Sequence, residues 1–188
     1  MTNNELINRL QHKDQSAYVE LISAFQDHVV NTCYGFVQSE EDARDVAQEV
    51  FVEVFLSIRH FRADASLGTW IYRIAINKSL DFIRKKNRKK RMAILLGFAG
   101  MNPQDQKRLA TNVETPSALL EQKERRDLLN TAIKKLPENQ RVAWTLHKIE
   151  QISYSEIANI MGTSVPAVES LIHRAKKKLY TVLERIME

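Results

Sequence analysis

Apolar side chains recur at three- and four-residue steps along most of this 188-residue chain. That period puts them on one face of an α-helix, whereas the alternation typical of a half-buried strand is absent. Asp14 and Ser39 each stand before such a run and are suited to cap a helix. The pattern therefore predicts an all-α protein. Its later helices are expected near residues 69–91, 117–135, 138–149, 153–160 and 165–186.

One segment breaks the helical pattern. Residues 97–116 contain two glycines, two prolines and many small polar residues, a composition typical of linkers. Thr115 and Pro116 then suit the cap and the first turn of the next helix. We therefore expect two small helical domains, at residues 1–93 and 117–188, joined by a flexible linker over residues 94–116.

Charge is distributed unevenly between these parts. Residues 1–60 carry 4 basic and 10 acidic side chains, net −6, whereas residues 61–91 carry 10 and 2, net +8. Residues 126–188 carry net +3. Such separation indicates two partners of opposite charge, an anionic polymer and a basic surface. A membrane surface is a further candidate for the basic part.

The single cysteine, Cys33, excludes an internal disulfide and fits a reducing compartment. It stands among valines and a phenylalanine, which favours a packed core thiol over a reactive one. The N-terminus has no basic-then-apolar signal, and no run approaches 18 apolar residues. We therefore expect a soluble protein of the cytoplasm.

The C-terminal part carries the most specific motif. Ser153 and Glu156 can form a capping box at the start of a short helix, and Gly162 can adopt the left-handed conformation of a turn. The spacing is that of a helix-turn-helix, whose second helix enters the DNA major groove. A structural hairpin with a solvated lysine face is the alternative. The exposed side of that second helix offers Glu169, Ser170, His173, Arg174 and Lys177.

The helix after Ser39 has two contrasting sides. Its predicted core side consists of Val46, Ala47, Val50, Phe51, Val54, Phe55 and Ile58. The opposite side is an acidic face made of Asp45, Gln48, Glu49 and Glu53. This acidic face repels DNA and suits a basic protein partner, although an ordinary solvated surface is the simpler interpretation.

The helix at residues 69–91 is apolar on most sides and ends in seven basic residues out of eight. A narrow polar stripe interrupts its apolar part, and it consists of Arg73, Asn77, Asp81 and Arg84. Asp81 and Arg84 lie three residues apart, so pairing along the helix is the alternative to a binding role for these two.

Three segments, in order, resemble the extracytoplasmic-function sigma factors of bacterial RNA polymerase. "DARDVAQEVF" at 42–51 is similar to their polymerase-binding helix, and "FRADASLGTWIYRIAINKSLDFIRKKNR" at 61–88 to their −10 promoter region. "LPENQRVAWTLHKIEQISYSEIANIMGTSVPAVESLIHRAKKKL" at 136–179 is similar to their −35-reading domain. The resemblance covers about residues 14–185.

The resemblance implies three sets of site residues. Binding of the polymerase core is expected at Asp45, Gln48, Glu49 and Glu53. Recognition of the −10 element is expected at Phe61, Arg62, Ser66, Arg73, Asn77, Asp81, Arg84 and Arg88. Recognition of the −35 element is expected at Glu169, Ser170, His173, Arg174 and Lys177. In this family the stripe faces the non-template strand, and the loop ahead of it holds a base flipped out of the stack.

The expected function is promoter-specific initiation, with RNA polymerase core, promoter DNA and an anti-sigma factor as partners. The five histidines form no metal-spaced cluster and no glycine-rich phosphate loop occurs, so no enzyme activity, metal or cofactor is expected. A DNA recombinase would need a nucleophile with supporting groups, which we do not find. An autonomous helix-turn-helix regulator, binding DNA without forming a holoenzyme, is the remaining alternative.

Overall fold

The computed structural model describes residues 3–62, 64–95 and 127–187, and across these ranges it contains helices and no strand. The predicted all-α class is thus confirmed. Residues 127–134 are helical. The other elements are α1 (Asn3–Gln11), α2 (Gln15–Val37), α3 (Glu40–Ser57), the 3-10 turn η1 (Ile58–His60), α4 (Leu67–Leu95), α6 (Glu138–Lys148), α7 (Tyr154–Met161) and α8 (Val165–Met187).

The predicted caps set the starts of the first long helices. The Asp14 carboxylate accepts hydrogen bonds from the backbone N–H groups of Ser16 (2.8 Å) and Ala17 (3.4 Å) at the start of α2. The Ser39 hydroxyl accepts one from Asp42 N–H (3.3 Å) at the start of α3. Each bond satisfies a donor that the helix itself leaves free.

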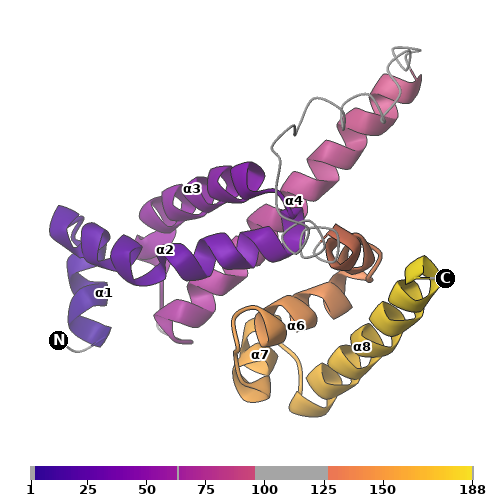
Figure 1. Cartoon of the computed structure of the whole chain (residues 1–188). Helices are drawn as coiled ribbons and strands as arrows, with labels where there is room; N and C mark the ends of the chain where they lie inside the picture. Colours follow the sequence, from indigo (N-terminus) through magenta and orange to yellow (C-terminus); the bar gives the residue numbers. More distant parts are fainter. Residues whose placement is uncertain (1–2, 63, 96–126, 188) are drawn as a thin grey trace, which may run out of the picture.

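Helices α2, α3 and α4 pack together as the core of the first domain, which the structure describes over residues 3–95 (Figure 1). Leu21, Val50 and Ile71 are among its fully buried side chains. Cys33 is also fully buried, and this burial raises the pKa of its thiol to about 11. The prediction of a packed core thiol is confirmed.

Two features of the first domain differ from the sequence prediction. Helix α1 was not predicted; it inserts the fully buried Leu10, and the Gln11 side chain donates to the Phe61 carbonyl (3.1 Å). Phe55 was placed on the core side of α3 but is 44% exposed, where its ring lies 4.9 Å from that of Tyr18. The apolar stripe is wider than the core that covers it, so its edge stays in solvent.

The second domain, described over residues 127–187, contains the predicted helix-turn-helix. Ser153 and Glu156 form the capping box of α7, and Gly162 ends this helix in the left-handed conformation with φ 63°. Helix α8 packs on α6 and α7 through a buried face that consists of Val168, Ile172, Ala175 and Leu179. Local sequence signals were sufficient here because each one fixes a single turn.

The two domains lie side by side, with α7 against α4 and α6 against α2 (Figure 1). Apolar residues of both belong to one continuous buried cluster. Helix α4 continues to Leu95, so the first two residues of the predicted linker 94–116 are helical, and the rest of it lies outside the described residues. The exact domain boundaries, at residues 93 and 117, therefore stay a prediction from the sequence.

Candidate nucleic-acid interface

The polar stripe of α4 is exposed at all four positions, yet two of its members contact the second domain. Arg73 donates from Nε to the Ile160 carbonyl (3.1 Å) and from Nη2 to the Asn159 carbonyl (2.6 Å). These carbonyls lie at the C-terminal end of α7, where the helix dipole attracts a cation. Asn77, one turn further along α4, is exposed.

Arg84, at the far end of the stripe, makes two kinds of ion pair. It donates to the Asp81 carboxylate (3.2 Å) along α4 and to both carboxylate oxygens of Glu138 (3.0 and 3.1 Å) on α6. The intrahelical pairing proposed from the sequence spacing is therefore present. The bonds from Arg84 Nη2 to both oxygens of Glu138 were not predicted, because they join residues 54 apart in the chain.

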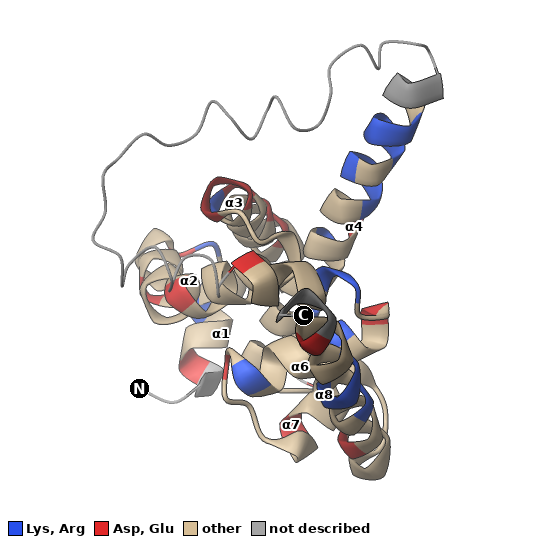
Figure 2. Ribbon diagram, turned by 45° about the vertical axis from the view of Figure 1, so that its right-hand side comes forward, with Lys and Arg blue, Asp and Glu red and all other residues tan. Residues whose placement is uncertain are grey.

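The loop before α4 is shaped by two of the predicted −10 residues. Phe61 is buried, and its ring centroid lies 5.1 Å from that of Trp70, so the structure does not present this ring to a DNA strand. Ser66 caps α4 by accepting from the Thr69 N–H (3.0 Å). Arg62 and Arg88 are exposed, and Figure 2 shows that Lys and Arg recur along the ribbon of the projecting end of α4.

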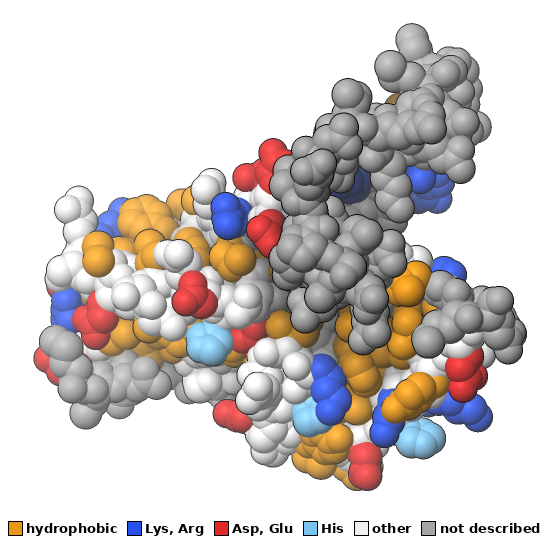
Figure 3. Space-filling view, in the orientation of Figure 1, with side chains coloured by type: hydrophobic (Ala, Val, Ile, Leu, Met, Phe, Trp, Pro, Cys, Tyr) orange, Lys and Arg blue, Asp and Glu red, His pale blue; other side chains and the backbone are white. Residues whose placement is uncertain are grey.

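The acidic face of α3 is exposed at Asp45, Gln48 and Glu49. Acidic positions recur along the ribbon of α3 in Figure 2. Glu53 is half-buried and accepts a bond from Lys78 Nζ on α4 (2.9 Å). Beside this face the structure exposes apolar side chains that the sequence analysis missed, Val52 (57%) and Leu56 (59%). Both residues lie outside the predicted core side of α3. Their place in the helical pattern could therefore have indicated that they are exposed. Figure 3 shows hydrophobic side chains at the surface over α2 and α3.

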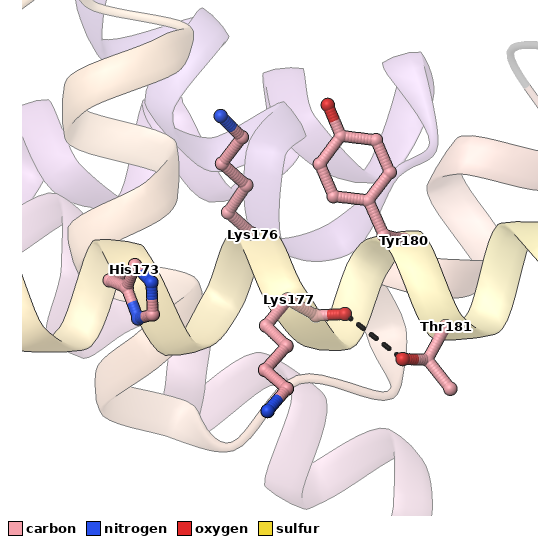
Figure 4. A pocket seen from close by; sticks show the side chains of 5 residues that line it. All are labelled: His173, Lys176, Lys177, Tyr180 and Thr181. Atoms are coloured by element: carbon pink, nitrogen blue, oxygen red, sulfur yellow. Dashed lines mark hydrogen bonds between the residues drawn. The ribbon is translucent and has the colours of Figure 1, made fainter.

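All five predicted −35 residues are exposed on α8. His173 and Lys177 also line a shallow open hollow, together with Lys176, Tyr180 and Thr181 (Figure 4). The Lys176 ammonium lies 5.8 Å from the centre of the Tyr180 ring. A convex helix face with several cations and hydrogen-bonding groups fits a DNA groove better than a small-molecule pocket.

A buried polar cluster between the domains was not predicted. The Glu150 side chain is only 1% exposed, and its Oε2 accepts from His28 Nδ1 (2.8 Å) and from the Tyr72 hydroxyl (3.2 Å). Burial raises the pKa of Glu150, although the bonds to His28 and Tyr72 partly oppose the shift. Burial and the nearby Glu150 carboxylate raise the pKa of Tyr72 as well.

Comparison with known proteins decides the family. Residues 21–89 match Sigma-70 region 2, and residues 126–179 match Sigma-70, region 4. The ECF RNA polymerase sigma-E factor of Haemophilus influenzae is 31% identical over 187 residues, covering 100% of this chain and 98% of the relative. That of Escherichia coli K12 is 31% identical over 179 residues, covering 95% and 93%. The chain belongs to the ECF RNA polymerase sigma factors.

Solved structures agree with this sigma-factor fold. CnrH, solved in complex with the cytosolic domain of CnrY, has a TM-score of 0.69 and 24% identity, with 97% of each chain covered. The sigma factor RpoE of Bartonella quintana, solved with the anti-sigma factor NepR, has a TM-score of 0.62 and 16% identity, covering 89% of this chain and 96% of that one. At these identities the likeness concerns the fold.

The family identity fixes the general role of the protein. As an ECF sigma factor it joins RNA polymerase and directs promoter-specific initiation. The two matched segments contain the acidic face, the polar stripe and the exposed side of α8. Within the described ranges, no helix combines the length and apolarity that a bilayer crossing needs. Across the same residues, His, Cys, Asp and Glu form no group of three suited to hold a metal ion.

Proposed function

We propose that the three polar surfaces divide the work of initiation between protein and DNA partners. The acidic face of α3, at Asp45, Gln48, Glu49 and Glu53, docks on the polymerase core. The polar stripe and the projecting basic end of α4 bind the −10 element, and α8 binds the −35 element. The observation that carries this proposal is the separation of the exposed acidic face from the exposed basic helices. Opposite charges at separate places suit partners of opposite charge.

At the −10 element, we assign positioning and reading to different residues. Arg73, Arg84 and Arg88 hold phosphates, whereas the Asn77 amide can both donate to and accept from a base edge. Asp81 orients Arg84 through the bond seen along α4. The loop before α4 holds a flipped-out base, with Arg62 and Ser66 at its surface and Phe61 supporting it from below.

At the −35 element, α8 enters the major groove. Arg174 can bind guanine through two hydrogen bonds, and Glu169 can accept from the amino group of cytosine. Ser170 and His173 complete the base-reading set, and Lys177 reaches a phosphate. Each of these side chains is exposed in the structure, as direct reading requires.

The protein acts by binding, with no chemistry of its own, and it works in the cytoplasm beside RNA polymerase. By analogy with the Bartonella factor solved with NepR, an anti-sigma factor is its expected regulator. The exposed Val52 and Leu56 next to the acidic face provide apolar area that either protein partner can bury.

Pull-down of purified polymerase core tests the proposal. Gln48→Ala combined with Glu49→Ala should abolish core binding and leave the melting temperature unchanged, because exposed polar changes shift stability by less than about 0.5 kcal/mol. Gln26→Ala with Asp27→Ala is the matched control, since it removes the same kinds of group from exposed positions on α2. Normal core binding by the first variant would exclude the acidic face. Tight promoter binding by the wild type without any core binding would favour the autonomous regulator.

A further inference from the structure

Helix α1 lies before the segment that matches Sigma-70 region 2, which begins at residue 21, yet it contacts the loop that leads into α4. The Gln11 side-chain amide donates from Nε2 to the Phe61 carbonyl (3.1 Å) and, over a longer distance, to the Ile58 carbonyl (3.5 Å). Phe61 is the residue at which the chain leaves the turn η1 in an extended conformation. One side chain of α1 therefore holds the backbone where this loop begins.

The end of α1 that carries Gln11 is itself anchored without the help of this amide. The Leu10 side chain is fully buried, and the Leu10 carbonyl accepts a bond from the Tyr18 hydroxyl on α2 (3.2 Å). Arg9 donates from Nε to the carboxylate of Asp14, the residue that caps α2 (2.8 Å). Removal of the Gln11 amide should therefore leave α1 in place and release only the start of the loop.

The other end of the loop is held by α4. The Ser66 hydroxyl accepts from the Thr69 N–H (3.0 Å) and donates to the Thr69 hydroxyl (2.9 Å). Trp70 packs against the Phe61 ring, with 5.1 Å between the ring centroids. Arg62 and Ser66 nevertheless stay exposed. A loop that is ordered before it binds its ligand avoids the entropic cost of ordering on binding, and so gains affinity.

We propose that Gln11 is a positioning residue for recognition of the −10 element. Its amide holds the Phe61 carbonyl so that the exposed Arg62 and Ser66 are placed to receive a flipped-out base. This inference rests on the proposed function in assigning the loop before α4 to that base. Gln11 acts through the backbone of Phe61 and does not contact the DNA. Base selection thus depends in part on α1, a helix outside the matched region 2.

The expected consequence is a loss of base discrimination at a single position of the −10 element. A loop that is free at its start samples several conformations, and its apparent affinity falls with the fraction that can receive the base. The loss applies only to the base that this loop holds, because the exposed polar residues of α4 and α8 keep their places. Discrimination at that position should fall about 3–10-fold, the range that one hydrogen bond supports.

Selection of −10 sequences by holoenzyme, assembled from polymerase core and each variant, tests the proposal. The probe is a library of forked duplexes whose single-stranded non-template end is randomised. Gln11→Met keeps an unbranched side chain without a donor, and Gln11→Glu keeps only acceptors, so both should lose base enrichment at one position.

Two further variants complete the test. Gln11→Lys supplies an ammonium that can donate to the same carbonyl and should restore the enrichment. Asn8→Met places the same methionine at an exposed position of α1 and should select like wild type. Melting temperature and core pull-down are measured for every variant.

Four outcomes separate the explanations. Loss of enrichment at one position in Gln11→Met and Gln11→Glu, with recovery in Gln11→Lys and normal core binding throughout, supports the positioning role. Unchanged enrichment in Gln11→Met overturns it and leaves the proposed function standing. Equal weakening at all positions with a lower melting temperature also overturns it, because Gln11 would then only stabilise the fold. If wild-type holoenzyme selects no −10 sequence although core pull-down is normal, the assignment of the loop to a base is overturned, and the role of Gln11 with it.

Discussion

Helices α4 and α8 carry polar surfaces of the same kind, yet the fold treats them differently. Both helices present cations and hydrogen-bonding groups opposite an apolar side that packs in a core. On α8 that polar surface faces solvent. On α4 two of its members also bond the second domain, Arg73 to carbonyls of α7 and Arg84 to Glu138 of α6, although all four positions remain exposed. A stripe that looks like solvent-facing surface in a sequence can therefore be a binding surface for the same chain.

The difference between the two helices also concerns how replaceable their contacts are. Exposed ion pairs such as Arg84 with Glu138 contribute little net stability, because water solvates the separated charges well. Phosphate oxygens can take the place of the carboxylate and the α7 carbonyls with similar geometry. The apolar part of the domain contact, around Gly35 and Thr145, has no such substitute in DNA. The contact between the domains therefore depends on apolar packing more than on these ion pairs.

The largest expected effect comes from Asn77 on α4. Asn77→Ala should keep core binding and lose opening of double-stranded promoters, because it removes a base-reading amide from an exposed position. A promoter with a premelted −10 bubble should restore activity in part, since unstacking is already complete while base reading is still missing. Transcription assays on both templates, with core pull-down, provide the measurement.

Asn31→Ala, an exposed asparagine on α2, is the control for Asn77→Ala and should leave both templates active. Loss of core binding by Asn77→Ala at a normal melting temperature would show that α3 and α4 do not divide the partners as proposed.

The second effect concerns α8, whose predicted −35 residues are all exposed. Arg174→Ala should weaken binding to the preferred −35 sequence by about 1–3 kcal/mol if the guanidinium binds guanine through two hydrogen bonds. Its Nε already bonds the Ser170 carbonyl (3.2 Å), which holds the side chain along the exposed side of the helix. Competition binding against a set of −35 duplexes is the measurement. An equal loss on every duplex would make Arg174 a phosphate contact.

The contrast between α4 and α8 also shows what the sequence was able to predict. The helix starts at Asp14, Ser39 and Ser153 and the left-handed turn at Gly162 were predicted, because each depends on residues within one turn. The bond from Arg73 to α7 was not, because periodicity identifies an apolar or polar side without identifying what meets it.

Residues at the domain contact gave equally weak signals. In the sequence, Gly35 is simply a residue that disfavours a helix. The structure explains it by the close approach of Thr145, which lies 110 residues further along the chain. Glu150 reads as a surface carboxylate, although its side chain is buried against His28 and Tyr72. Phe61 resembled a base-contacting aromatic and is instead packed on Trp70. The position of a polar surface could be predicted where it lies on one helix, and not where residues of two domains meet.

The smallest expected effect is a pH dependence of the contact on α4. Glu150 is faced by His28 from α2 and Tyr72 from α4, with Glu156 of α7 nearby. Burial raises the pKa of Glu150 above its ordinary value of 4.5. The closed form, with the two domains in contact, therefore binds a proton more readily than an open form with the domains apart. Its contribution to closure is therefore complete below that value and is lost as pH rises through the raised pKa.

The radius of gyration of the free protein should thus increase as pH rises from the ordinary glutamate value of 4.5. Glu150→Gln keeps groups that can bond His28 and Tyr72 but cannot ionise, so its profile should be flatter. An expansion on acidification at constant helix content would contradict the assigned direction. Equal slopes in wild type and Glu150→Gln would remove Glu150 from the closing contact, and α4 would then be held by packing alone.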